Sequence, residues 1–172
     1  AIGLVGSEMC IRDSFIANWK MFGGLSTLNS LEKVIKFLKI FKKSKKIKII
    51  YCPPNTLIRS MSKKVINSKI QVGAQNCHES LNYGASTGSI NPTMLKNVGT
   101  KYVILGHSEN RVSGETDKLI NAKIKSATKS GLKVIFCIGE TLVQKRKKIT
   151  KKILSKQITL GLQKINKKKN IV

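Results

Sequence analysis

The sequence of 172 residues predicts an α/β fold built on a parallel sheet. Short runs rich in β-branched residues alternate with longer stretches in which apolar residues recur at helical spacing. Successive runs start about 31 residues apart, and eight such units would take about 248 residues, close to the roughly 250 of a (β/α)8 barrel. The sequence holds five units and the start of a sixth, so a five-stranded flavodoxin-like sheet also fits its length.

Six runs have the composition of strands, because valine and isoleucine dominate them and turn-forming residues follow several of them. We expect strands at 15–18, 47–52, 70–74, 102–106, 134–139 and 171–172. Helical stretches separate these runs, which favours parallel pairing.

Each helical stretch has an apolar face that can cover the sheet. The stretches are 28–41, 57–65, a short piece after Pro92, 119–127 and one long, very basic helix from Leu142 to about Lys168. Gly131 is expected to end the fourth of them, since glycine favours helix C-termini.

The charge is strongly positive, with 33 basic against 8 acidic residues and a formal net charge of +25. Such an excess is typical of nucleic-acid-binding proteins. Only four of the 33 are arginine, however, the residue that reads base edges and grips phosphates with two hydrogen bonds. Aromatic residues make up 5% and do not interleave with the basic ones. We therefore expect lysine-rich, solvated helix faces and no specific nucleic-acid partner.

The cysteines and apolar runs point to a cytoplasmic protein without a metal site. The four cysteines are scattered, with none of the pairings or histidine spacings of a zinc site: Cys10, Cys52, Cys77 and Cys137. No apolar run approaches the roughly 20 residues that span a bilayer, so no membrane partner is expected.

Polar side chains stand where the predicted strands end. They are Asn18 and Lys20 after the first run, His107, Ser108 and Glu109 after the fourth, and Cys137 in the fifth. In a barrel these ends converge on one mouth, so Lys20 and His107 can face one small ligand. An ammonium group suits a phosphate or a developing oxyanion, and a neutral imidazole can donate to a carbonyl oxygen. The pair suits proton abstraction beside a carbonyl group.

Each of these residues also has an ordinary interpretation. Lys20 can be a solvated loop residue and His107 an ordinary polar loop residue. Glu109 can cap a short helical turn, since carboxylates favour helix N-termini. Cys137 has apolar neighbours and fits a packed core better than a nucleophile.

Six segments occur in the order, and at nearly the spacing, found in one enzyme family: "FIANWKM", "VGAQNCH", "GASTG", "LGHSE", "GETD" and "VIFCIGETL". From residue 15 to residue 172 the sequence resembles triosephosphate isomerase. The resemblance implies a partial TIM barrel that stops in its sixth strand. It also implies an aldose-ketose isomerase of glycolysis and gluconeogenesis, which interconverts dihydroxyacetone phosphate and D-glyceraldehyde 3-phosphate through an enediolate without cofactor or metal.

The resemblance also implies roles for individual residues. Asn18 and Lys20 match the family residues that hold the substrate, and His107 matches the histidine that polarises the carbonyl. Ser108, Glu109 and Cys137 match supporting positions, with Glu109 as the partner of Lys20 when no substrate is bound. Thr87 matches a threonine on the loop that enters the partner subunit, which implies a homodimer, although Ser89 stands where a glutamate is frequent.

Two departures limit what the resemblance implies. Residues 1–14 match nothing in the family, so we expect a non-native leader there and an incomplete barrel domain over 15–172. The family's base glutamate follows the sixth strand and is absent, so the 172 residues alone are expected to be inactive. The alternative is a non-catalytic five-stranded α/β protein that binds a phosphorylated ligand or nucleic acid.

Overall fold

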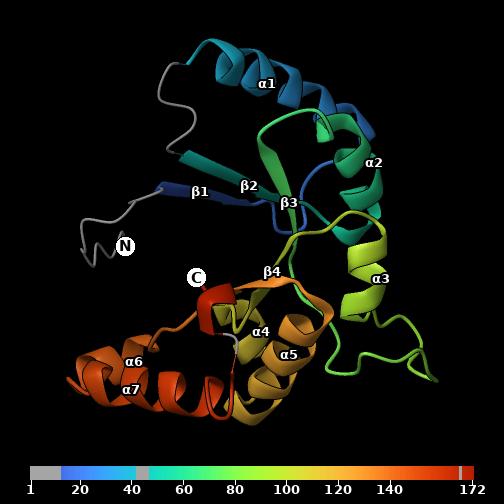
Figure 1. Ribbon diagram of the computed structural model, residues 1–172. Coiled ribbons are helices and arrows are strands. Elements are labelled where there is room, and N and C mark those ends of the chain that lie inside the picture. Colours follow the sequence, from blue (N-terminus) through green and yellow to red (C-terminus); the bar gives the residue numbers. More distant parts are fainter. Residues whose placement is uncertain (1–12, 42–46, 167) are drawn as a thin grey trace.

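The computed structural model, which describes residues 13–41, 47–166 and 168–172, contains a sheet of five parallel strands in chain order. The strands are β1 (Asp13–Asn18), β2 (Ile47–Cys52), β3 (Ile70–Ala74), β4 (Tyr102–Leu105) and β5 (Lys133–Phe136). A flavodoxin-like sheet would place the first strand between the second and third. The unbroken order and the curvature of the sheet are those of a partial TIM barrel, as predicted (Figure 1).

The helices follow the strands as the alternating pattern predicted. They are α1 (Ser30–Ile40), α2 (Asn55–Val65), α3 (Pro92–Asn97), α4 (Ser108–Val112), α5 (Asp117–Ser130), α6 (Leu142–Arg146) and α7 (Thr150–Gly161), with 3₁₀ helices η1 (Leu25–Asn29) and η3 (Lys168–Asn170). Gly131 ends α5 with φ of +89°, as expected for a helix C-terminus. No helix in the described part of the chain is long and apolar enough to cross a membrane.

The prediction of one long C-terminal helix was wrong. The chain forms α6 and α7 instead, and Lys148 between them has φ of +55°, which a continuous α-helix does not allow. A single helix would also stack Lys147 over Lys151 and Lys148 over Lys152, and like charges four residues apart destabilise a helix.

The bounds of two strands differ most from the prediction: β1 begins earlier than expected, and β5 ends earlier. β1 begins at Asp13, whereas the rest of the expected leader, residues 1–12, lies outside the described residues. Strand β5 ends at Phe136, so Cys137 lies in the loop that follows it. Ile171 forms a parallel bridge with Val134, where the sixth strand was expected.

Side chains alternate between the two faces of the sheet and build two apolar layers. The outer face of β4 contributes Val103 and Leu105 to the large core between sheet and helices. Its inner face contributes Tyr102 and Ile104 to a smaller cluster inside the curve, together with Ile50, Cys52 and Ile135. Gly73 faces the same side, where a Cβ atom would lie 2.5 Å from the sulfur of Cys52.

The outer core should dominate the stability of the chain. Ile124 on α5 is fully buried in it, so Ile124→Ala should lower the free energy of unfolding by about 2 to 5 kcal/mol through lost burial and the cavity left behind. Urea denaturation measures the change. Lys125→Ala, one residue along on the exposed side, should stay within about 0.5 kcal/mol of the unmodified protein. Equal losses from both variants would contradict this packing.

Candidate active site

Lys20 and Glu109 meet at the carboxyl end of the sheet, although 89 positions separate them in the sequence. Lys20 follows β1 and Glu109 lies on α4, directly after β4. The Lys20 ammonium donates to Glu109 Oε1 at 2.8 Å, and the two side chains are 50% and 59% exposed. The curvature of the sheet therefore brings together two of the residues that the sequence singled out.

The ion pair changes the acidity of the Glu109 carboxyl. The hydrogen bond from Lys20 lowers the pKa of Glu109, and the positive charge of Lys20 acts in the same direction. Partial desolvation acts in the opposite direction but is outweighed. Glu109 is therefore an ionised partner for Lys20 near neutral pH.

His107 caps the start of α4 through its side chain. Its Nδ1 accepts a hydrogen bond from the Glu109 backbone N–H at 3.3 Å and lies 3.5 Å from Glu109 Oε2. When Nδ1 is an acceptor, a neutral imidazole carries its proton on Nε2. The side chain is 23% exposed, so this Nε2–H can donate to a ligand at the mouth of the sheet.

Arg111 ties the ends of β4 and β5 together, a role that the sequence reading did not assign. Its guanidinium donates to the carbonyl oxygens of Gly106 at 2.7 Å and Cys137 at 3.2 Å, and to the carboxylate of Asp117 at 2.6 Å. These bonds hold the residue before His107 to the loop that follows β5. In the sequence, the family segment "LGHSE" ends at Glu109, two residues before Arg111, so the resemblance drew attention to this loop but not to Arg111 itself.

Cys137 fits the packed interpretation. It lies against the cluster inside the curve, and burial raises the pKa of its thiol, while the nearby Arg111 lowers it less. Deeper burial raises the pKa of Cys52 to about 12, with a smaller contribution from Cys137. Both thiols are therefore protonated near neutral pH and poor nucleophiles. Cys52, Cys77 and Cys137 are all free, and Cys10 lies outside the described residues.

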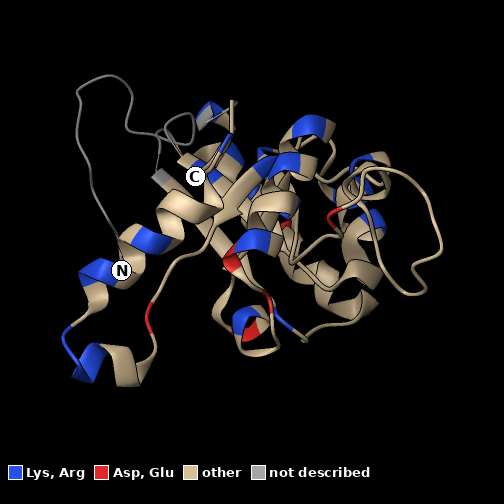
Figure 2. Ribbon diagram, turned by 90° about the horizontal axis from the view of Figure 1, so that it is seen from below, with Lys and Arg blue, Asp and Glu red and all other residues tan. Residues whose placement is uncertain are grey.

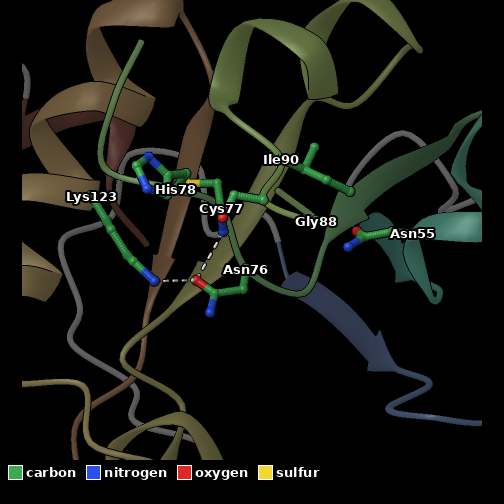
Figure 3. A pocket seen from close by; sticks show the side chains of 8 residues that line it. Asn55, Asn76, Cys77, His78, Gly88, Ile90 and Lys123 are labelled. Carbon is green, nitrogen blue, oxygen red and sulfur yellow. Dashed lines mark hydrogen bonds between the residues drawn. The ribbon is translucent and has the colours of Figure 1, made fainter. Parts of the chain in front are cut away.

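A second polar cluster follows β3 and was also missed. Lys123 Nζ contacts Glu115 Oε1 and donates to Asn76 Oδ1 at 3.2 Å, and Asn76 Nδ2 donates to Glu115 Oε1 at 2.7 Å. Asn76 and Lys123 line a pocket of about 180 Å³ whose wall includes Gly88 (Figure 3). The neighbouring Thr87 is exposed on its loop, and neither Lys20 nor His107 lines this pocket.

The possible metal ligands do not form a metal site in the part of the chain that the structure describes. There, no three His, Cys, Asp or Glu side chains are grouped closely enough to hold a metal ion. The groups gathered at the strand ends are one ammonium, one carboxylate and one imidazole, which can bind an anion and exchange a proton.

Comparison with known proteins identifies this arrangement. The family model described as triosephosphate isomerase matches residues 14–172. The chain belongs to the triosephosphate isomerase family. A triosephosphate isomerase of Carboxydothermus hydrogenoformans is 42% identical over 154 residues, which cover 88% of this chain and 60% of that protein. One of Thermodesulfovibrio yellowstonii is 43% identical over 152 residues, with 88% and 61% covered.

The fold agrees with that of a solved member of the triosephosphate isomerase family. The crystal structure of triosephosphate isomerase from Bartonella henselae matches with a TM-score of 0.84 at 32% identity. The match covers 94% of this chain and 65% of that one. The chain thus spans about 60% of the length of the curated triosephosphate isomerases it matches.

Replacement of Gly106 by alanine should destabilise the fold more than the same replacement at Gly131. Its φ is +76°, and a Cβ atom would lie 2.7 Å from the Cys137 carbonyl oxygen. Gly131 has φ of +89°, but there a Cβ atom would meet only the flexible end of Lys96 at 3.1 Å. Both Gly→Ala changes carry the left-handed strain of about 1 to 2 kcal/mol, and the clash should add about 1 to 3 kcal/mol for Gly106→Ala. Similar denaturation midpoints for both variants would argue against this close approach.

The Lys20–Glu109 pair should be visible as an acid-sensitive contact. A lowered pKa in the folded state stabilises the fold above the unfolded glutamate pKa of about 4.3, and this contribution is lost as pH falls through the folded value. Carboxyl ¹³C NMR should place the Glu109 titration below that of an ordinary glutamate. In Lys20→Met the titration should return to the ordinary range. A Glu109 titration unaffected by Lys20→Met would mean that the pair does not form in solution.

Proposed function

We propose that the protein to which these residues belong interconverts dihydroxyacetone phosphate and D-glyceraldehyde 3-phosphate by proton transfer through an enediolate. The observation that carries the proposal is the convergence of Lys20, Glu109 and His107 at the mouth of a TIM barrel of this family. In TIM barrels, chemistry is performed at the carboxyl ends of the strands.

Each group has a defined part in this reaction. The His107 Nε2–H donates to the substrate carbonyl oxygen, which polarises the adjacent C–H bond, and the imidazole carries a proton between the two oxygens of the enediolate. Lys20 leaves Glu109 for the substrate and balances the charge on the enediolate oxygen, with Asn18 beside it. Ser108 begins α4 and supports His107. No cofactor or metal is required, because the carbon-bound proton is taken up and returned by a glutamate base, which in the triosephosphate isomerase family follows the sixth strand.

We further propose that the 172 residues alone do not turn over substrate. Abstraction of a carbon-bound proton needs a carboxylate held in position. Glu109 is paired with Lys20, and Glu140, beyond the end of β5, accepts a hydrogen bond from Thr150 at 3.3 Å. We assign the base to neither of them, because in the triosephosphate isomerase family the base is a glutamate that follows the sixth strand.

The same proposal extends to a cytoplasmic homodimer. Met21 and Phe22 after β1 are 94% and 74% exposed, and Tyr83 on the loop of Thr87 is 70% exposed. Adjacent exposed apolar side chains, as at Met21 and Phe22, are typical of interaction surfaces. A second copy that receives the Thr87 loop beside Lys20 would cover them.

The basic charge fits solvated helices better than a nucleic-acid site. Figure 2 shows lysine and arginine on most of the helices and few acidic residues among them. We propose no specific nucleic-acid partner. Any binding to duplex DNA would come from counterion release, and would be indifferent to sequence and lost steeply with salt.

The proposed activity can be tested by completing the barrel. We expect the 172 residues to be inactive in a coupled isomerase assay, whereas a hybrid that continues with the remaining part of the Carboxydothermus hydrogenoformans relative should be active. His107→Gln in the hybrid should lower kcat by about 10² to 10⁴, the usual contribution of a positioned acid or electrophile.

His78→Gln is the matched control, because His78 is the other histidine of the sequence and its side chain is similarly exposed, at 26%. It should leave kcat within about twofold, as expected for a residue without a catalytic role. A folded hybrid without activity, or one that tolerates His107→Gln, would overturn the proposed function.

A further inference from the structure

A glutamine side chain joins the ends of the first three strands. Gln75 directly follows β3, and its Nε2 donates to the carbonyl oxygen of Cys52 at 2.9 Å and to that of Lys20 at 2.8 Å. Cys52 is the last residue of β2, and Lys20 lies two residues beyond β1. The Cys52 carbonyl oxygen also accepts the Trp19 N–H at 3.0 Å. The Gln75 side chain therefore adds to a backbone hydrogen bond that already joins the ends of β1 and β2.

The backbone of Lys20 needs such support. Its φ is +52°, in the left-handed region that residues with a Cβ atom rarely adopt. Such a conformation persists only where the surroundings impose it. The Asn18 side chain accepts the Lys20 N–H at 2.9 Å, and Gln75 donates to the Lys20 carbonyl oxygen. Side chains therefore hold both polar groups of the Lys20 backbone.

The conformation of Lys20 decides where its ammonium points. With φ of +52° its Nζ lies 2.8 Å from Glu109, which follows β4, the third strand along the sheet from β1. Rotation of φ to the ordinary negative region would turn the Cα–Cβ bond away from its present direction. We propose that Gln75 is a positioning residue, which keeps Lys20 in the left-handed conformation and so directs its ammonium group to Glu109. The importance of this for catalysis rests on the proposed function, whereas the positioning itself does not.

The test replaces the amide and follows the ion pair. In Gln75→Leu, which keeps the bulk but removes the N–H donors, Lys20 should relax and separate from Glu109. Carboxyl ¹³C NMR on the full chain should then show the Glu109 titration moving up to the ordinary range of a glutamate. Gln71→Leu is the matched control, because it makes the same change near the start of β3, whereas Gln75 directly follows the end of that strand. Its Glu109 titration should equal that of the unmodified chain.

A purely structural role would give a different result. If Gln75→Leu melts at a lower temperature but keeps the low Glu109 titration, Gln75 supports the fold without positioning Lys20, and the proposal is wrong. If Gln75→Leu does not fold, the proposal is tested by hydrogen exchange in the unmodified chain. There the Gln75 side-chain amide protons should exchange with solvent at least tenfold more slowly than those of an exposed glutamine, and equal exchange rates would overturn the proposal.

Neither measurement uses turnover, so the two proposals can fail separately. An inactive hybrid in which the Glu109 titration still responds to Gln75→Leu would refute the isomerase function and leave the positioning role intact. An active hybrid without that response would refute only the positioning role.

Discussion

The geometry of this chain depends on how the concave face of its sheet is filled. A barrel interior must be packed by side chains, and here β2 and β4 supply Cys52 and Tyr102 from either side of β3. They meet over Gly73, where a Cβ atom would lie 2.5 Å from the Cys52 sulfur and 3.4 Å from the Tyr102 Cβ. The absence of a side chain at this position lets the neighbouring strands close over β3, which curves the sheet and draws the ends of its strands toward one mouth.

At that mouth the backbone no longer has strand partners, and side chains replace them. Asn18 and Gln75 bond the Lys20 backbone, and Arg111 bonds the carbonyl oxygens of Gly106 and Cys137. Buried or half-buried carbonyl groups need such donors, because an unpaired one is costly. The same bonds hold the loops that carry the Lys20 ammonium and the His107 imidazole. The hydrogen bonds that satisfy the backbone at the strand ends therefore also position these two side chains.

The alternating pattern predicted the parallel sheet, because each βα unit carries its own local periodicity. It could not distinguish a barrel wall from a flavodoxin-like sheet, since strand order is a long-range property. The family motifs predicted the partnership of Lys20 and Glu109. The roles of Gln75 and Arg111 were missed because each bonds at least one carbonyl group more than 20 residues away, which residue type does not reveal. The helix break at Lys148 was missed because the apolar spacing continues across it.

The strand order has a consequence for synthesis. Each strand pairs with the one that follows it in the chain, so no other strand lies between pairing partners in the sequence. Folding is faster when contacts join nearby segments, and synthesis delivers the N-terminal strands first. In a sheet ordered β1 to β5, each new strand finds its neighbour already made. The order of translation is thus also the order in which the wall of the barrel can grow.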